Sequence, residues 1–383
     1  MQTVQELEEL FEKYWENEKG YIVMPYTIRA RAYLAVIADD IHIEAVLDNN
    51  DALDNTYFGD IQIKAASKFL KENISQNGVK KKILVSAHYS EIAEQLKNAG
   101  YVENIDFIDM HMFVSIYYWR KKGEIHLLDV HTAITTYCSL NCKNCNMFIN
   151  HYADSRRRNI GMEEFRENFT ALFKNVDYCY KVSILGGEPL LNSELTQMLD
   201  WLYKEYGSRI GQIVIVTNGT VPVQERLMKV LKETGTKISI SDYTASIPYD
   251  EKLKRFEDEL KNSGIEFETN KEMKWKNFFF PEEKQKVGFE SAREHMLCCN
   301  PVFRGLNDKK FYYCHIVWSA VQAGLLKEDK ADFVDLEDIK SPAERKKLLS
   351  HDLGFVENGS ISLCRYCGGC GSDNESLVVA GVQ

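Results

Sequence analysis

The segment HLLDVHTAITT (residues 126–136) runs almost directly into the loop CSLNCKNC (residues 138–145), and this stretch decides how the chain folds. The first segment is an apolar run that predicts a strand. The loop places three thiols within eight residues, separated by three and then two residues. We therefore expect the loop to lie at the carboxyl end of a strand, where a parallel sheet carries its functional groups.

Strand and helix patterns alternate after this loop. Helices are predicted at 162–176, at 195–202, between Pro222 and Gly235, and through 253–260. Further strands are predicted at 181–185, 212–216, 237–241 and 265–269. Apolar strands separated by helices predict an α/β fold whose parallel sheet is curled or closed.

Two segments with other patterns flank this region. The first begins with an amphipathic helix around Leu7 to Tyr14 and continues in a βαβ style. The last has weak periodicity and most of the cysteines, which predicts a small fold organised by a metal. We therefore expect three domains, at 1–124, 125–285 and 286–383.

The composition and the charge argue against two classes of protein, those that bind nucleic acid and those that span a membrane. The 383 residues carry 47 basic and 57 acidic side chains, a formal charge of −10, and no basic block suits a phosphate backbone. The start, MQTVQELEELFEKYW, is acidic and amphipathic, and no apolar run has the length of a membrane span. We expect a cytoplasmic protein without a nucleic-acid partner or a membrane span.

Nine of the ten cysteines fall into tight clusters, and Cys179 stands alone without an assigned role. Without an export signal, such clusters favour metal ligation over disulfides. The clustered cysteines are Cys138, Cys142, Cys145, Cys298, Cys299, Cys314, Cys364, Cys367 and Cys370.

The first three cysteines supply three ligands and leave one position open. Structural zinc usually takes four protein ligands, whereas an iron-sulfur cubane held by three cysteines keeps one iron free for a small molecule. The alternative is a zinc site that takes His131 or His151 as its fourth ligand.

Three further motifs follow the cysteine loop in order: Gly186-Gly187-Glu188-Pro189, Thr217-Asn218-Gly219, and the serines Ser239 and Ser241. With the cysteine spacing, they resemble the radical S-adenosylmethionine (SAM) superfamily. The resemblance implies a partial (β/α)6 TIM-like barrel and a [4Fe-4S] cluster on Cys138, Cys142 and Cys145. It also implies that the glycine-glycine-glutamate motif contacts the amino group of SAM, and that Asn218, Ser239 and Ser241 contact its carboxylate and ribose. Asn144 departs from the family, which usually has an aromatic residue there to seat adenine.

The same resemblance implies a mechanism. An electron from a flavodoxin or ferredoxin-type donor passes through the cluster into SAM, which yields methionine and a 5′-deoxyadenosyl radical. That radical abstracts hydrogen from an unactivated C–H bond, a task beyond protein acids and bases.

The second cysteine set supplies two distant thiols and a close pair, Cys299, Cys314, Cys364 and Cys367. This layout resembles the Twitch domain, the shortened form of the SPASM auxiliary-cluster domain. It implies one auxiliary [4Fe-4S] cluster on these four cysteines, with Cys298 and Cys370 as extra candidates. Structural zinc is the alternative, since CxxC pairs fit it equally well.

The first segment resembles a small Rossmann-type domain found in proteins of sugar and surface-glycan biosynthesis. The residues that carry this resemblance are Asp48-Asn49, residues 57–61, residues 83–87, residues 91–96 and Gly100-Tyr101. No glycine loop follows its first strand, where residues 24–29 read MPYTIR, so we expect a docking or substrate-recognition module. Asp48 is a candidate for a ribose hydroxyl or for a turn.

Two other groups are candidates for substrate contacts. Asp242 and Tyr243 follow a predicted strand, where catalytic residues of a barrel lie. Arg156, Arg157 and Arg158 form either a phosphate site or a solvated turn.

The sequence therefore predicts a radical SAM oxidoreductase or epimerase acting on a small-molecule or glycan substrate. The first alternative is a maturase of a ribosomally synthesised peptide. The second is a non-catalytic, zinc-stabilised binding protein.

Overall fold

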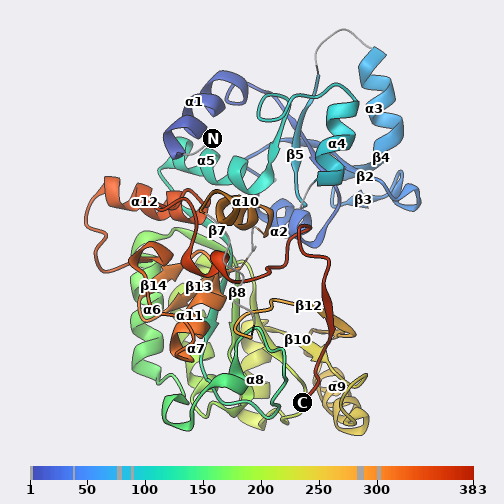
Figure 1. Ribbon diagram of the computed structural model, residues 1–383. Helices are drawn as coiled ribbons and strands as arrows, with labels where there is room; N and C mark the ends of the chain where they lie inside the picture. The colour runs from blue at the N-terminus through green and yellow to red at the C-terminus, as the bar shows by residue number, and fades with distance from the viewer. Residues whose placement is uncertain (1–2, 38, 76–79, 88–89, 283–288, 300–302) are drawn as a thin grey trace. The chain divides into compact units, whose positions relative to one another are not determined.

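The computed structural model describes residues 3–37, 39–75, 80–87, 90–282, 289–299 and 303–383. The chain divides into two compact units, residues 1–126 and 127–383, and each unit has a sheet of its own (Figure 1). None of the helices among the described residues is both long and apolar enough to cross a membrane.

The first unit is a six-stranded sheet with helices between its strands. Its helices are α1 (Val4–Tyr14), α2 (Ile28–Ile37), α3 (Ala66–Ser75), α4 (Ser90–Asn98) and α5 (Met110–Lys122). Its strands are β1 (Tyr21–Met24), β2 (Ile43–Asp48), β3 (Tyr57–Phe58), β4 (Ile61–Ala65), β5 (Lys82–Val85) and β6 (Phe107–Asp109). The sheet order is β3-β4-β2-β1-β5-β6, and all pairs except β3 with β4 are parallel.

The parallel strands of this unit follow the order of a doubly wound sheet, with the order reversing between β1 and β5. At the carboxyl end of β2, the two carboxylate oxygens of Asp48 accept the backbone N–H groups of Tyr26 and Asn50, both at 2.8 Å. These bonds support the turn role for Asp48 over the ribose role. The unit is centred on buried apolar residues such as Ile22, Leu47 and Ile83.

The second unit contains the predicted barrel strands and the second cysteine set. Its strands are β7 (His126–Ala133), β8 (Tyr178–Leu185), β9 (Ile213–Thr217), β10 (Lys237–Asp242), β11 (Phe267–Lys271), β12 (Lys274–Lys276), β13 (Arg304–Asn307), β14 (Lys310–Tyr312), β15 (Phe333–Asp335) and β16 (Leu377–Val379). Its helices are α6 (Met162–Asn175), α7 (Leu195–Tyr206), α8 (Glu225–Thr234), α9 (Asp250–Ser263), α10 (Phe289–Cys299), α11 (His315–Gln322) and α12 (Pro342–Asp352).

An eight-stranded sheet organises this unit, in the order β11-β10-β9-β8-β7-β13-β14-β15. The pairs β8–β9, β9–β10 and β10–β11 are parallel, which confirms the predicted parallel α/β sheet. Side chains alternate along β9 and β10: Ile215 and Ile240 are fully buried, whereas Val216 and Ser239 are half-buried. One face of the sheet is therefore a closed apolar layer against helices, and the other is more open.

The segment predicted as a separate third domain contributes to this same sheet. Strand β13 pairs parallel with β7, and β14 and β15 follow as antiparallel neighbours. Asn307 on β13 reinforces the join, because its side chain bonds both the backbone N–H (3.1 Å) and the backbone C=O (2.9 Å) of Ala133. The predicted boundary at residue 285 lies outside the described residues, and strands from both sides of it, β11 and β13, belong to one sheet.

A buried histidine makes the second unit sensitive to acid. Burial, aided by the nearby positive charge of Arg304, lowers the pKa of His351 to about 4. The imidazole Nε2 accepts the backbone N–H of Tyr313 at 3.2 Å, so the folded protein keeps His351 neutral. In the unfolded chain, the His351 imidazole binds a proton near pH 6.5. Its contribution to the free energy of unfolding is therefore fully present above that pH and is lost as the pH falls toward 4.

We therefore expect the free energy of unfolding to fall between pH 7 and pH 4 by about 3 kcal/mol more in the wild type than in His351→Gln. Glutamine can still accept the Tyr313 N–H but does not titrate. Urea unfolding of both proteins at several pH values tests this. Equal pH slopes would show that His351 does not govern the acid response.

Candidate active site

The cysteine loop begins five residues beyond the end of β7. The Cys142 side chain is buried, and Cys138 and Cys145 are partly buried. Burial raises the pKa of all three thiols, that of Cys138 to about 12. The thiols are therefore protonated near neutral pH until a metal displaces their protons.

Close backbone packing explains the two glycines of the GGEP motif. A Cβ at Gly187 would lie 2.1 Å from the carbonyl oxygen of Tyr137, and a Cβ at Gly186 would lie 2.4 Å from that of Thr135. The same segments are bonded, since the Gly187 and Glu188 N–H groups donate to the carbonyls of Thr135 and Tyr137, each at 2.8 Å. The glycines thus let the backbone after β8 pack directly against the backbone that leads into the cysteine loop.

The carboxylate of Glu188 joins the end of β8 to the end of β9. It is fully buried and accepts the Thr217 hydroxyl at 2.8 Å, the Asn218 N–H at 2.9 Å and the Leu190 N–H at 3.1 Å. Burial raises its pKa to about 7, although all three donors favour the carboxylate. Sequence reasoning assigned this carboxylate to the SAM amino group, and the structure places it under the TNG turn.

Asn218 connects that turn to the cysteine loop. Its amide nitrogen lies 3.1 Å from the Ser139 hydroxyl and 3.7 Å from Cys138 Sγ. Its amide oxygen accepts the Thr220 N–H at 2.9 Å. The structure therefore brings the first three predicted motifs together at the carboxyl ends of β7, β8 and β9, through one chain of hydrogen bonds. Ser139 and the Thr217 side chain belong to this chain of hydrogen bonds, and the sequence had assigned neither of them a role.

The residues predicted on β10 divide between the two faces of the sheet. Ser239 and Ser241 lie on the more open face, where the Ser239 hydroxyl donates to Glu268 at 3.1 Å. Asp242 is buried and accepts the Thr244 N–H at 2.7 Å, and Tyr243 packs edge-on against Trp275 at 5.3 Å. The catalytic role of Asp242 and Tyr243 stays a prediction, and the structure gives each of them a structural contact.

The hydrogen-bonded residues Cys138, Glu188 and Asn218 form a cradle at these strand ends. Residues 132–262, which contain this cradle, match the family model of the Radical SAM superfamily. This segment of the second unit is therefore similar to radical SAM domains. Over 109 residues, 28% of this chain and 36% of the relative, the chain is 30% identical to an uncharacterized protein of Methanocaldococcus jannaschii. Over 122 residues, 32% of this chain and 37% of the relative, it is 33% identical to GTP 3',8-cyclase of Aquifex aeolicus. The chain thus spans little more than a third of the length of these curated relatives.

Among solved structures, the chain is similar to BtrN in complex with AdoMet and 2-DOIA. The similarity has a TM-score of 0.44 and 14% sequence identity, and it covers 66% of this chain and 97% of that chain.

The donor set of the cysteine loop fits the [4Fe-4S] cluster that the family implies. The three cysteines supply soft sulfur ligands. N–H donors lie near two of the sulfurs, from Leu140 to Cys138 at 3.4 Å and from the Gln383 side chain to Cys142 at 3.3 Å. Such hydrogen bonds are a recognised means of setting cluster potentials.

Five cysteines of the second set line one cavity in the same unit, namely Cys299, Cys314, Cys364, Cys367 and Cys370. Cys298 turns toward Ser372, with its sulfur 3.4 Å from the hydroxyl. Cys370, the extra candidate ligand, lines the cavity with the other four, and its sulfur lies 3.4 Å from that of Cys299. Within the described ranges, no three His, Cys, Asp or Glu side chains are grouped as around a single metal ion.

The three consecutive arginines that follow the cysteine loop form hydrogen bonds and an ion pair with neighbouring segments. Arg157 donates to the backbone carbonyls of Thr136 and Ile149, at 3.3 and 2.9 Å. Arg158 forms a two-point ion pair with Glu164, at 2.6 and 3.0 Å. Arg156 donates to a backbone carbonyl at 3.1 Å. These contacts favour neither of the predicted alternatives, a phosphate site or a solvated turn.

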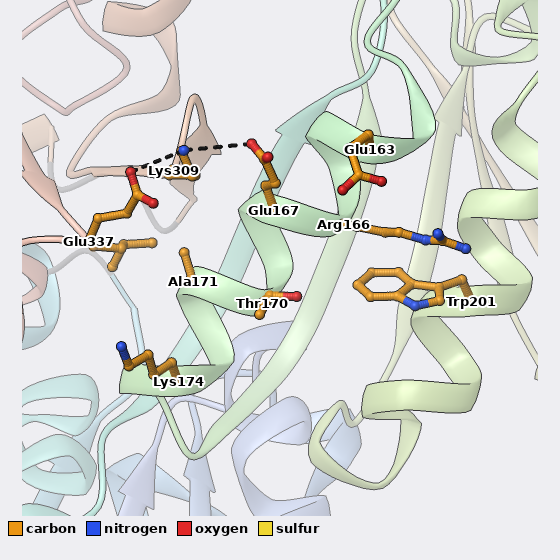
Figure 2. Close-up of a pocket in the computed structure, with 10 residues that line it drawn as sticks. Glu163, Arg166, Glu167, Thr170, Ala171, Lys174, Trp201, Lys309 and Glu337 are labelled. Carbon is orange, nitrogen blue, oxygen red and sulfur yellow. Dashed lines mark ion pairs between the residues drawn. The ribbon is translucent and has the colours of Figure 1, made fainter.

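A cavity of about 570 Å³ lies elsewhere, along the outer side of α6. Figure 2 shows that its walls come from α6, from Trp201 on α7, and from Lys309 and Glu337. Lys309 pairs with Glu167 at 3.6 Å and with Glu337 at 3.0 Å. None of the described residues predicted for the active site lines it, so the candidate active site remains at the strand ends.

Substituting Gly187 by alanine tests the packing under the cysteine loop. Because the new Cβ would meet a backbone carbonyl, we expect Gly187→Ala to lower the free energy of unfolding by at least about 2 kcal/mol. Gly161→Ala is the matched control, since a Cβ there lies 3.8 Å from the nearest side chain. Thermal unfolding of both variants gives the comparison, and equal melting temperatures would refute the close approach.

Proposed function

We propose that this chain cleaves SAM reductively and uses the resulting 5′-deoxyadenosyl radical to abstract hydrogen from a substrate. The observation that carries the proposal is the hydrogen-bonded cradle of Cys138, Asn218 and Glu188, which unites three strand ends within the segment that matches the Radical SAM family model. A parallel α/β sheet carries its active groups at this edge.

In this proposal, Cys138, Cys142 and Cys145 hold the [4Fe-4S] cluster, which supplies the electron for SAM cleavage when bound. Asn218, Ser239 and Ser241, with the backbone of the GGEP motif, bind and orient SAM. The Glu188 carboxylate already accepts three donors, so we assign it the task of holding the TNG turn against the cysteine loop. A flavodoxin or ferredoxin-type protein is the proposed electron donor.

We further propose that the second cysteine set holds one auxiliary [4Fe-4S] cluster in a Twitch-like segment, with Cys299, Cys314, Cys364 and Cys367 as ligands. Their position around a single cavity supports this ligand set, and the orientation of Cys298 toward Ser372 argues against that residue as a ligand. Structural zinc in the same cavity is the alternative.

For the substrate we propose a sugar or glycan-pathway intermediate that undergoes oxidation or epimerisation. The support comes from the first unit, whose parallel strands have the order of a doubly wound sheet, as in a Rossmann-like substrate-recognition module. The alternatives are a peptide maturase and a zinc-stabilised binding protein without catalysis.

The test is an anaerobic assay of the full chain, reconstituted with iron and sulfide, in the presence of SAM and dithionite. We expect 5′-deoxyadenosine to form, and a nucleotide-sugar library to raise its yield more than a peptide library does. A greater response to peptides would favour the maturase. Zinc in place of iron, with no 5′-deoxyadenosine, would leave the binding protein as the correct assignment.

A further inference from the structure

The last seven residues, Leu377–Gln383, form a strap that crosses the second unit to reach the cysteine loop. Strand β16 pairs antiparallel with β12, with Val378 opposite Trp275 and Val379 opposite Lys274. In Figure 1 this red segment runs beside β12 to the end of the chain. Beyond β16, the Ala380 N–H donates to the Met273 carbonyl at 3.2 Å.

A glycine lets the strap pass over Tyr243. Gly381 has a φ of +75°, which disfavours other residues, and a Cβ there would lie 2.9 Å from the Cβ of Tyr243. The ring of Tyr243 is itself fixed by Trp275. The strap therefore follows a defined path between β12 and the cysteine loop.

At its end the strap bonds three consecutive residues of the loop. The Lys143 N–H donates to the Val382 carbonyl at 2.6 Å, and the Asn141 N–H donates to the side-chain oxygen of Gln383 at 2.7 Å. The side-chain nitrogen of Gln383 lies 3.3 Å from Cys142 Sγ. A carboxamide suits this position because it offers an acceptor and a donor in one neutral group.

We propose that Gln383 is a positioning residue that clamps the cysteine loop and directs an N–H donor at the sulfur of Cys142. The inference rests on the proposed function, because the donor acts on a cluster held by that sulfur. An N–H donor stabilises the more negative, reduced cluster and so raises its reduction potential. The backbone bond to Lys143 keeps the loop in reach of the donor.

The variants separate the donor from the clamp. Gln383→Glu keeps an oxygen acceptor for Asn141 but replaces the donor by a carboxylate oxygen, and Gln383→Ala removes both. Val382→Ala keeps the carbonyl that Lys143 uses. Gln224→Ala is the matched control, because Gln224 is exposed and its side chain makes no capping hydrogen bond to the start of α8.

Two measurements on the full chain test the proposal. In the reconstituted protein, potentiometric titration follows the EPR signal that shifts when SAM is added. We expect a more negative midpoint potential in Gln383→Glu and Gln383→Ala, and wild-type values in Val382→Ala and Gln224→Ala. In the metal-free protein, we expect the Asn141 backbone amide to exchange with deuterium about fivefold faster in Gln383→Ala than in the wild type or in Gln383→Glu. Only the alanine variant lacks the acceptor of that amide, and about fivefold is the factor that one typical hydrogen bond represents.

The outcomes distinguish this inference from the proposed function. Unchanged potentials together with an unchanged exchange rate of the Asn141 amide would overturn the role of Gln383, while a SAM-responsive cluster would leave the proposed function intact. If the loop holds no cluster, the proposed function fails and the tuning role fails with it, and the exchange rate of the Asn141 amide then decides whether the clamp itself exists.

Discussion

Replacing Cys138, Cys142 and Cys145 together by alanine is expected to remove about four of roughly eight iron atoms and to abolish 5′-deoxyadenosine formation. The physical reason is that these three thiols are the soft ligands of the loop, and Cys138 belongs to the cradle with Asn218 and Glu188. Oxygen and nitrogen ligands do not replace three thiolates in holding an iron-sulfur cluster. Iron and sulfide analysis after anaerobic reconstitution, paired with chromatography of the SAM products, measures both effects.

Cys179→Ala is the matched control for this triple variant. Cys179 is fully buried on β8, and burial raises the pKa of its thiol, so it is an inert core residue. We expect its iron content and SAM cleavage to equal those of the wild type. Retention of all iron and of SAM cleavage in the triple variant would remove the cysteine loop from the mechanism.

The alternation of strands and helices from β7 to β11 was predictable because hydrophobic periodicity is a local signal. The strand expected at 181–185 is the end of β8, and the helix expected at 162–176 is α6, Met162–Asn175. The motifs that end β7, β8 and β9 were recognisable for a related reason. Each lies where a parallel strand ends, so their meeting point follows from the topology.

The contacts made by those motifs could not be read from the sequence. A glutamate in a glycine-rich turn suggests a ligand for a cation, yet the Glu188 carboxylate is buried and accepts two donors, Thr217 and Asn218, from the end of a strand about 30 residues later. The same limit applies to Gln383, which bonds a loop 242 residues away in the sequence. No local pattern marks such a long-range partner.

The pairing of the cysteine-rich segment with the sheet could not be predicted for a similar reason. Strand β13 is only four residues long, Arg304–Asn307, and its pairing with β7 depends on Asn307 and on the register of Gly305 with His131. A short strand without alternation carries little periodic signal. Its place beside β7 is decided by tertiary contacts.

The second large effect concerns the C-terminal cysteines. Replacing Cys364 and Cys367 by serine should lower the iron content from about eight to about four atoms while SAM cleavage without substrate persists. Both thiols line the cavity shared with Cys299 and Cys314, and burial raises the pKa of Cys367 to about 12, so each needs a metal to lose its proton near neutral pH. Metal analysis and the assay of 5′-deoxyadenosine measure the two outcomes separately.

Cys298→Ser supplies the matched control, because its sulfur lies toward Ser372 and outside the set of cavity thiols. We expect that variant to keep all its metal. Loss of zinc with unchanged iron in the double variant would establish a structural zinc site in the cavity. Full iron in the double variant would instead remove Cys364 and Cys367 from the ligand set and leave Cys299, Cys314 and Cys370 as the thiols of the cavity.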